Sequence, residues 1–337
     1  MKLLVTGGAG YIGSHMVKLL LDDGHEVVTL DNLSTGHRDA VLGGELIHGD
    51  LADRPLLDKL FSEHRFDGVL HFAAFIEVAE SVRDPGKYYR NNLANTINLL
   101  DAMVAREVNH FILSSTAAIF GEPRYVPIDE KHVRNPINPY GLSKWMVEKI
   151  LADYDRAHGL KSICLRYFNA AGADPSGLLG ERHEPESHLI PLVLQAASGR
   201  RAAIQIFGDD YDTPDGTCVR DYIHIVDLCQ AHLLAMDKLV RENKSAAYNL
   251  GNGSGFSVRQ VIDTARRVTG CDIDALPAPR RAGDPARLVA DSKLARRALH
   301  WTPRYADLET IIDHAWLWEQ RFTRAHATAA TARRNAR

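Results

Sequence analysis

The chain has 337 residues, of which 45% are hydrophobic and 25% charged, and its net charge is -3. This composition is typical of a globular protein with one large core and a smaller lobe, and it excludes disordered and fibrous proteins. The balanced charge provides no basic field for nucleic acid or an anionic membrane, and no apolar run reaches the length of a membrane span. We therefore expect a small-molecule partner, with no nucleic acid and no membrane.

The start of the chain and its cysteines predict a cytoplasmic location. Lys2 is followed by only three apolar residues before Thr6, which is too short for the core of a signal peptide. The four cysteines, at positions 164, 218, 229 and 271, lie far apart and contain no CxxC pair. Such spacing indicates reduced cysteines rather than a disulfide or zinc framework.

The first predicted element is a short apolar strand, Lys2–Thr6, followed at once by the glycine-rich segment Gly7–Gly13 and a helical pattern. These glycines permit a tight turn and the close approach of a pyrophosphate, which the helix N-terminus attracts. A second strand, Glu26–Leu30, ends in Asp31, whose carboxylate can accept hydrogen bonds from an adenosine ribose; NADP would favour a cation there. The succession of strand, glycine turn, helix, strand and acidic residue predicts an NAD site. The alternative is that the glycines form a purely structural turn.

Short apolar strands and helical patterns continue to alternate along the first half of the chain. The expected strands are Glu45–His48, Gly68–Phe72, His110–Ser115 and Lys161–Tyr167, and the expected helices include Pro55–His64, Tyr88–Arg106 and Pro139–His158. This alternation predicts a Rossmann-type, doubly wound parallel sheet.

Ligands of such a sheet gather at the carboxyl ends of its strands. We therefore expect Asp50 to lie near the adenine, although a solvated loop acid is an equally good interpretation. The hydroxyls of Ser114, Ser115 and Thr116 are expected to face the same crevice. Their alternative role is simply to close a strand.

Tyr140 and Lys144 stand four residues apart on the predicted helix that begins at Pro139. This spacing puts them on one helix face. A nearby ammonium stabilises the phenolate, and the positive charge of an oxidised nicotinamide adds to the effect. The tyrosine pKa is therefore expected to fall towards neutrality, where the phenolate can act as a general base. A pair on a helix surface is usually inert, but the preceding dinucleotide fold favours the catalytic interpretation.

The pattern changes after the sixth strand. Residues 174–186 are rich in glycine, proline and charge, which predicts the start of a second lobe with a short helix at Leu189–Ala197. Ile204–Phe207 is an expected strand whose Phe207 either stacks on a base or packs in a core. Arg220 and the pair Arg280–Arg281 could converge on one diphosphate, or they could belong to charged loops.

Two histidines in this region superficially suggest a metal site. However, Pro185 breaks any helix, and His183 and His188 are five residues apart rather than four. Because zinc hydrolases place their histidine pair on a helix, the spacing predicts no metal here.

Five motifs resemble, in order and spacing, those of the extended short-chain dehydrogenase/reductases, and within that family the UDP-hexose 4-epimerases. They are Leu4–His15, His71–Ala74, Asn138–Lys144, Leu165–Pro175 and Asp215–His224. The resemblance extends from Leu3 to Gln320 and implies a Rossmann domain that keeps NAD tightly bound, together with a smaller mixed α/β lobe for the substrate.

The family implies reversible epimerisation at C4 of UDP-glucose or UDP-galactose through a transient 4-keto sugar. Tyr140 would take the proton of the 4-hydroxyl, Thr116 would hydrogen-bond to the same oxygen, and Lys144 would hold the nicotinamide ribose and lower the tyrosine pKa. The ketone would turn its other face before reduction. This needs a firm grip on the UDP and a loose grip on the sugar.

The resemblance also assigns binding residues position by position. Those for NAD would be Gly7, Gly10, Tyr11, Ile12, Gly13, Asp31, Asn32, Asp50, Leu51, Phe72, Ala73, Asn91, Tyr140, Lys144 and Tyr167. Those for the substrate would be Thr116, Tyr140, Asn169, Leu189, Phe207, Arg220, Arg281 and Asp284.

The implied domains are an NAD-binding Rossmann domain at 1–175, to which a segment at about 218–250 returns, and a UDP-sugar-binding lobe at 176–322. A terminal helix is expected at Asp307–Gln320, followed by a disordered tail at 323–337, which is rich in Ala, Thr and Arg. The family further implies a homodimer, formed through the helices that carry Tyr88 and Lys144.

Two positions depart from the family pattern. Ile76 stands where some members carry a lysine near the substrate phosphates. Leu288 stands where members restricted to plain hexoses carry a tyrosine. Because leucine is smaller, we hypothesise that the pocket also admits the N-acetyl group of UDP-GlcNAc or UDP-GalNAc. UDP-arabinose/UDP-xylose 4-epimerisation is an alternative, because those enzymes share much of the motif set.

Three other functions are less consistent with the sequence. A nucleotide-sugar 4,6-dehydratase carries Asp-Glu directly after the active-site threonine, whereas Ala117 and Ala118 follow Thr116 here. An oxidoreductase that releases NADH would leave the UDP-binding motifs unexplained. A cofactor sensor without chemistry would not need Tyr140 and Lys144.

Overall fold

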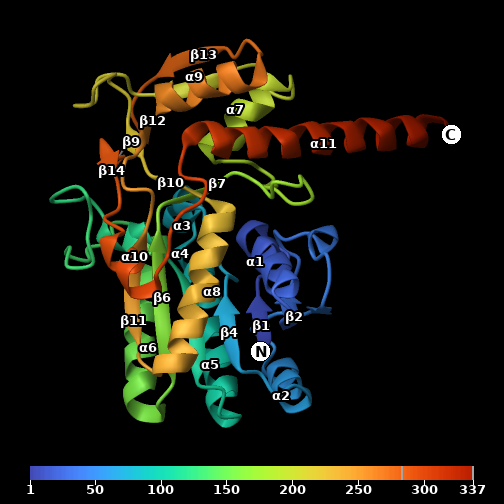
Figure 1. The fold of residues 1–337 in the computed structure, drawn as a ribbon, viewed down its shortest axis with the longest axis vertical. Coiled ribbons are helices and arrows are strands. Elements are labelled where there is room, and N and C mark those ends of the chain that lie inside the picture. Colours follow the sequence, from blue (N-terminus) through green and yellow to red (C-terminus); the bar gives the residue numbers. More distant parts are fainter. Residues whose placement is uncertain (282–283, 336–337) are drawn as a thin grey trace. The chain divides into compact units, whose positions relative to one another are not determined.

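The computed structural model describes residues 1–281 and 284–335, and the chain divides into two compact units (Figure 1). Unit 1 comprises Met1–Phe168, Leu228–Gly251 and Ala290–Thr302, and unit 2 comprises Asn169–Asp227, Asn252–Val289 and Pro303–Arg337. The chain therefore leaves unit 1 seven residues before the boundary expected at 175, and a second late segment, Ala290–Thr302, joins unit 1 without having been predicted.

Unit 1 is built on a seven-stranded sheet in which all neighbouring strands are parallel. In spatial order its strands are β3 (Glu45–His48), β2 (Glu26–Asp31), β1 (Lys2–Thr6), β4 (Gly68–His71), β5 (His110–Thr116), β6 (Lys161–Tyr167) and β11 (Ala246–Leu250). This order is that of a Rossmann sheet, so the predicted doubly wound fold is confirmed.

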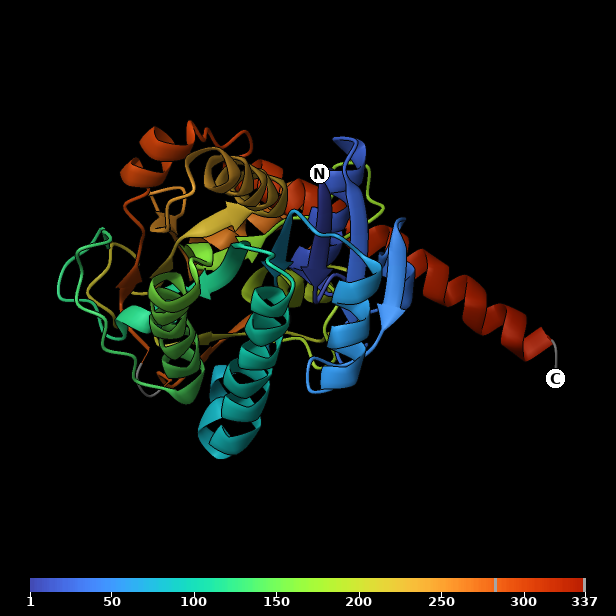
Figure 2. The same cartoon turned by 90° about the horizontal axis from the view of Figure 1, so that it is seen from below.

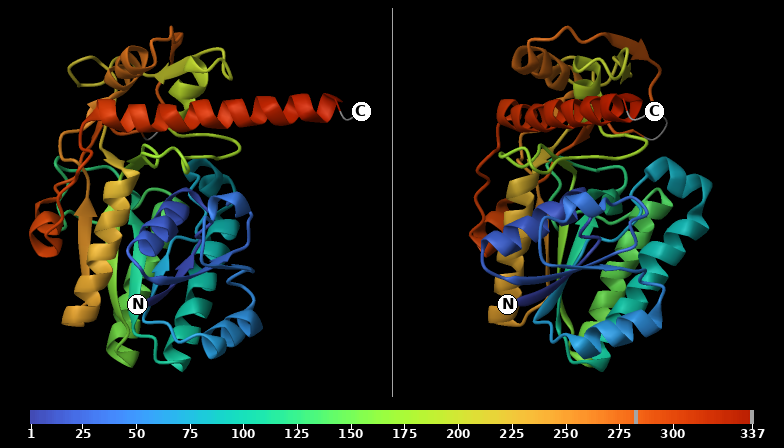
Figure 3. Two further views of the ribbon diagram at one scale, coloured as in Figure 1. Left: turned by 45° about the vertical axis from the view of Figure 1, so that its right-hand side comes forward. Right: turned by 90° about the vertical axis from the view of Figure 1, so that its right-hand side faces the viewer.

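Helices cover both faces of this sheet (Figures 2 and 3). One face carries α1 (Tyr11–Asp22) and α8 (Ile225–Glu242), and the other carries α2 (Arg54–Glu63), α5 (Asn95–Ala105) and α6 (Pro139–His158). The second face buries a core that includes Leu4, Leu60, Leu100, Met103 and Leu151. Since both faces are covered, the strands are apolar throughout rather than alternating.

The long helix predicted at Tyr88–Arg106 consists of three successive segments. They are α4 (Pro85–Tyr88), a π-helical turn η2 (Tyr89–Ala94) and α5. Such π-turns inside helices occur frequently at functional sites, and this one contains Asn91.

Helix α6 begins and ends where local sequence requires it. The side chain of Asn138 accepts a hydrogen bond from the amide of Gly141 at 2.8 Å, and Pro139 occupies the first helical turn. Gly159 closes the helix in a left-handed conformation with φ 73°. These caps fix the register of α6, and with it the positions of Tyr140 and Lys144.

The described part of unit 2 contains three small sheets and three helices of at least two turns. The strand pairs are β7 (Asn169–Ala171) with β10 (Tyr222–His224) and β8 (Ile204–Phe207) with β13 (Ala275–Ala278), and the third sheet orders β12 (Phe256–Ser257), β9 (Val219–Arg220) and β14 (Arg287–Leu288). The helices are α7 (Leu189–Ala197), α9 (Val258–Thr269) and α11 (Leu308–Asn335). Their apolar faces share one core with Ile190, Val261, Ile262 and Ile311.

Helix α11 is longer than the sequence pattern predicts. The apolar spacing ends near Gln320, where we placed the end of the helix, but α11 continues to Asn335. The disorder expected at 323–337 stays a prediction. Alanine and arginine have high intrinsic helix propensity, so this segment forms a helix without an apolar face. The last two residues of the predicted tail lie outside the described residues.

No helix in the described part of the chain combines the length and the apolar character that a membrane span requires.

Candidate active site

The predicted cofactor residues all lie in unit 1, at the carboxyl ends of its strands or on the elements that follow. Gly7, Gly10, Tyr11, Ile12 and Gly13 follow β1; Asp31 and Asn32 end or follow β2; Asp50 and Leu51 follow β3; Phe72 and Ala73 follow β4; Asn91 lies in η2; Tyr140 and Lys144 lie on α6; and Tyr167 ends β6. Residues up to 160 positions apart are thus placed along one edge of the sheet, which is where parallel sheets bind nucleotides.

The glycine turn between β1 and α1 has no room for side chains at two of its positions. A Cβ on Gly13 would lie 2.1 Å from the carbonyl oxygen of Gly7, and Gly7 itself has φ +73°. A Cβ on Gly10 would meet only the Gly7 oxygen, at 3.4 Å. The backbone at Gly7 and Gly13 is tightly packed. The space around Gly10 leaves its backbone accessible to a ligand.

The N-terminus of α1 has a glycine at its cap position. Gly10 is its N-cap, and among the described residues no side chain caps this helix end. The uncapped amides and the positive end of the helix dipole favour a phosphate group.

Acidic and amide side chains at the ends of β2 and β3 interlock. The Asp31 carboxylate accepts hydrogen bonds from the amides of Ala9, at 2.9 Å, and Leu33, at 2.7 Å. Asn32 donates to Asp50 at 2.7 Å. Asp31 is therefore tied to the glycine turn, and its neighbour Asn32 is tied to Asp50. The role of both acids in holding an adenosine stays a prediction.

Lys144 is almost completely buried and reaches β5. Its ammonium donates to the carbonyl oxygen of Ser114 at 2.9 Å, and only 3% of the residue is exposed. Burial lowers the pKa of Lys144 to about 8. The hydroxyl of the same Ser114 is hydrogen-bonded to the hydroxyl of Tyr167. The end of β5 thus connects Lys144 to the end of β6.

The pKa of Tyr140 differs from the sequence-based expectation. Burial raises it, and a hydrogen bond from Thr116 opposes this rise only in part. The ammonium of Lys144 points at the Ser114 carbonyl, so it does not lower the tyrosine pKa in the protein alone. Formation of the phenolate therefore depends on additional positive charge, such as that of an oxidised nicotinamide.

A buried ion pair that the sequence analysis did not single out lies one helical turn beyond Lys144. Arg166 on β6 contacts Glu148 on α6 through two hydrogen bonds, at 3.0 and 2.6 Å, and Ser115 donates to the same carboxylate at 2.6 Å. This pair fastens α6 to β5 and β6 beside Thr116 and Tyr167. Its sequence signal is the arginine in an otherwise apolar strand, because a buried charge requires a partner.

The predicted UDP-binding residues all lie in unit 2, apart from Thr116 and Tyr140. Arg220 forms an ion pair with Asp284, and the guanidinium of Arg281 lies over the ring of Phe207 at 3.9 Å. Asn169 donates to the carbonyl oxygen of Asp221 at 3.0 Å, next to Arg220.

Leu189, the remaining UDP-binding candidate, is the first residue of α7, and its side chain packs against the core of unit 2. Arg280, by contrast with Arg281, is paired with Asp210 at 2.6 Å, as expected of a charged loop.

The two positions that depart from the family pattern have different surroundings. Leu288 on β14 is the direct partner of Arg220 on β9 in a parallel pair, so it lies beside a predicted phosphate-binding arginine. Ile76 is 39% exposed in the segment before α3 (Val78–Arg83). Leu288 therefore neighbours, in the sheet, an arginine that we predict to bind the substrate.

Comparison with known proteins establishes the family. The chain belongs to the NAD dependent epimerase/dehydratase family, whose sequence pattern matches residues 3–251. It is 52% identical to the UDP-glucose 4-epimerase of Halalkalibacterium halodurans, over 97% of this chain and 98% of the relative.

Solved structures agree. UDP-glucose 4-epimerase from Brucella ovis in complex with NAD is 48% identical, with a TM-score of 0.92 over 94% of this chain and 97% of that chain. The UDP-Glc/GlcNAc 4-epimerase of Campylobacter jejuni is 46% identical, with a TM-score of 0.84 over 95% and 99% of the two chains. The resemblance inferred from the five motifs is thereby confirmed.

The depressed pKa of Lys144 predicts that this residue costs stability. A fall from 10.5 to about 8 corresponds to about 3 kcal/mol against the charged form. Replacing it, in Lys144→Met, should raise the free energy of unfolding of the NAD-free protein at neutral pH, by less than this amount because the bond to Ser114 is also lost. Urea unfolding monitored by circular dichroism measures the change.

The sign of the pH dependence follows from the same shift. Below about pH 8 the lysine is charged in both the folded and unfolded protein, so its full cost is present; the cost declines as pH rises through the folded pKa, towards 10.5. The advantage of Lys144→Met should therefore shrink over that range. Lys149→Met, one turn further along α6 and exposed, is the matched control. A loss of stability in Lys144→Met larger than in this control would contradict the prediction.

Proposed function

We propose that the protein interconverts UDP-glucose and UDP-galactose by reversible epimerisation at C4, as an NAD-dependent isomerase. The observation that carries the proposal is the arrangement of Thr116, Tyr140 and Lys144 at the carboxyl end of β5, in a chain that shares about half of its residues with UDP-glucose 4-epimerases over nearly full length.

The residues of unit 1 fit NAD. The uncapped N-terminus of α1 and the open side of Gly10 suit its pyrophosphate, and the fixed carboxylate of Asp31 suits a ribose diol better than a 2′-phosphate. When bound, NAD supplies the hydride acceptor and donor that transient oxidation at C4 requires.

The chain's own residues would transfer the proton of the sugar 4-hydroxyl and orient the reacting groups. Tyr140 accepts the proton of the sugar 4-hydroxyl and returns it after the ketone has turned over. Thr116 hydrogen-bonds to the same oxygen and orients it. Lys144, held by the Ser114 carbonyl, supplies a cation for the nicotinamide ribose at the end of β5.

The residues of unit 2 would hold the UDP. Arg220 and Arg281 offer forked donors that suit a diphosphate. Arg220 is already paired with Asp284 and Arg281 lies over Phe207, so both side chains are oriented before a ligand arrives. Such preorganisation reduces the ordering cost of binding and permits the firm grip that leaves the hexose free to turn.

The family also contains dehydratases, but the site does not favour that reaction. Thr116 caps a short 3-10 helix, Ala117–Phe120, whose buried side chains are apolar. The acid and base that a dehydratase needs to expel water are therefore not supplied by the residues that follow Thr116. The high identity to hexose epimerases likewise does not favour the pentose alternative.

The central test uses the purified protein with UDP-galactose and no added cofactor. UDP-glucose should appear, separated by chromatography, and mixtures started from either sugar should converge to one ratio. Absorbance of NADH should not accumulate, because the cofactor is regenerated in each cycle. Steady build-up of NADH would instead indicate an oxidoreductase, and no conversion even after NAD is supplied would reject these sugars as substrates.

Tyr140→Phe separates catalysis from binding. The phenylalanine keeps the ring and removes the base, so kcat should fall by about 10²–10⁴-fold while NAD is retained. Undiminished turnover in this variant would reject Tyr140 as the base.

We further propose that Leu288 admits an N-acetylhexosamine, in line with its place beside Arg220 and with the similarity to a UDP-Glc/GlcNAc 4-epimerase. Leu288→Tyr should lower kcat/KM for UDP-GalNAc by about 10-fold or more and leave that for UDP-galactose nearly unchanged, because the larger ring excludes only the added group. Wild-type protein that does not turn over UDP-GlcNAc or UDP-GalNAc, while converting UDP-galactose normally, would refute this hypothesis.

We also propose a homodimer in the cytoplasm. Val78 and Val82 on α3 are 45% and 61% exposed, Met146 on α6 is 36% exposed, and α3 packs against α6. Exposed apolar groups on adjacent helices suit a helix-bundle interface. The four cysteines are free, as expected in a reducing compartment.

The proposed dimer is tested by introducing a charged residue into the exposed apolar surface of α3 and α6. Light scattering should give the wild type about twice the chain mass of 37.4 kDa, and Val82→Glu should shift it towards the monomer. Val240→Glu on α8, where the valine is 41% exposed, is the control and should stay dimeric. A monomeric wild type would contradict the proposal.

A further inference from the structure

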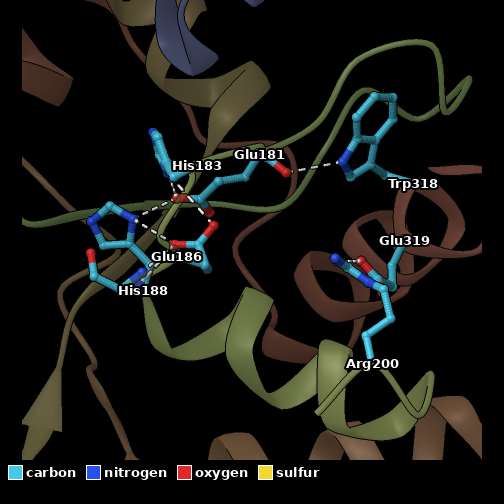
Figure 4. Close-up of polar contacts among 8 residues, drawn as sticks. Glu181, His183, Glu186, His188, Arg200, Trp318 and Glu319 are labelled. Atoms are coloured by element: carbon cyan, nitrogen blue, oxygen red, sulfur yellow. Dashed lines mark hydrogen bonds and ion pairs between the residues drawn. The ribbon is translucent and has the colours of Figure 1, made fainter. Parts of the chain in front are cut away.

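The loop that leads into α7 brings together two glutamates and two histidines (Figure 4). One candidate ligand atom from each of Glu181, His183, Glu186 and His188 lies within 4.8 Å of all the others. The carboxylate side chains are 5% and 4% exposed, and His183 is 19% exposed. The sequence analysis rejected a metal here because it expected helical spacing, but an irregular loop makes the cluster instead.

The distances within this cluster are close to those of a tetrahedral metal site. The Nδ1 atom of His183 lies 3.3 Å from a Glu181 oxygen and 3.6 Å from a Glu186 oxygen, and the Nδ1 atom of His188 lies 3.6 Å from the other Glu186 oxygen. Four ligands about 2.0–2.1 Å from one ion are separated by about 3.3–3.4 Å. The contact between His188 and Glu181, at 2.5 Å, must open, and the other ligand atoms, which lie within 4.8 Å of one another, need only small shifts.

The cluster requires positive charge. The carboxylates of Glu181 and Glu186 are almost completely buried, and each lies within 4 Å of both imidazoles. With neutral imidazoles the four side chains carry two negative charges, which one divalent cation balances. A cation therefore replaces protons that the carboxylates otherwise hold on the histidines.

We propose that Glu181, His183, Glu186 and His188 bind one Zn²⁺ ion, through the Nδ1 atoms of the histidines and one oxygen of each carboxylate. Two nitrogen ligands favour zinc over magnesium and calcium, which take oxygen ligands. A ligand set of imidazole and carboxylate in tetrahedral spacing is one that zinc uses in proteins.

Surrounding contacts hold the ligands and leave a path for the ion. Glu186 accepts hydrogen bonds from the amides of Ser187, at 2.8 Å, and His188, at 2.9 Å. Trp318 on α11 donates to the carbonyl oxygen of Glu181 at 3.0 Å. A cavity of about 230 Å³ in unit 2 is lined by Glu181, His183 and Glu186. Such outer contacts orient ligands, and the cavity gives the ion access.

Zinc would stabilise the start of α7. His188 is the N-cap of this helix, and the next residue is Leu189, which is assigned to the UDP group. An ion that fixes His188 would fix the entry to the helix as well. On this assignment the metal has a structural role in unit 2.

The test is titration calorimetry of tag-free, chelator-treated protein with ZnCl₂ at about pH 8, where protons compete less. We expect one Zn²⁺ per chain, no heat with MgCl₂, and a higher thermal midpoint with zinc. Glu186→Gln, which keeps the side-chain volume, should weaken binding by at least about 10-fold, and His183→Gln should weaken it further. His158→Gln, an exposed histidine at the end of α6, is the matched control and should bind as the wild type does.

X-ray absorption of the zinc-loaded protein distinguishes this site from the other histidines. Four nitrogen or oxygen ligands at about 2.0–2.1 Å, with imidazole scattering that Glu186→Gln and His183→Gln diminish, would support the proposal. Circular dichroism shows whether each variant folds. If one does not, the other variant and the wild-type spectrum still show whether these residues bind zinc. No binding by the wild type, or binding that both folded variants retain in full, would overturn the assignment.

Discussion

The buried ammonium of Lys144 is the interaction on which the candidate active site depends. It donates to the Ser114 carbonyl, so it can form only when α6 lies against the end of β5 in one register. The Asn138 cap sets that register from one end of the helix, and the Arg166–Glu148 pair fixes it one turn further on. Burying a cation without a carboxylate partner opposes folding, so stability alone does not account for a lysine at this position.

The two binding functions assigned to the chain use different kinds of rigidity. The cofactor turn is rigid because atoms already fill the space that side chains at Gly7 and Gly13 would need. The arginines assigned to the UDP are held by partners instead, Arg220 by Asp284 and Arg281 by Phe207. A backbone turn suits a cofactor that stays bound through many cycles. Paired side chains suit a substrate that must enter and leave, because the partners keep them oriented in between.

Features with a local sequence signal were predictable, and features made by tertiary contacts were not. The strands of unit 1, the glycine turn, Asp31 and the Tyr140–Lys144 spacing follow from short-range patterns, and the fold they predict is the one observed. The pKa of Tyr140 was expected to fall beside Lys144 and an oxidised nicotinamide together. In the protein alone burial raises it, which helical spacing does not encode. Helix α8 was missed, and α11 was predicted too short because its alanine-rich end follows propensity rather than apolar period.

Buried carboxylates occur in both units, and the partner chosen for each determines what the site can do. Glu148 is paired with Arg166, whose guanidinium keeps its proton at any physiological pH, so this pair is permanent and can only position α6. Glu181 and Glu186 are paired with histidines, whose protons can leave to solvent when a metal ion takes their place. Both groups of carboxylates need positive charge nearby. In unit 1 a permanent arginine supplies it, whereas in unit 2 either protons on the histidines or a metal ion can supply it. This difference favours a metal at the histidines.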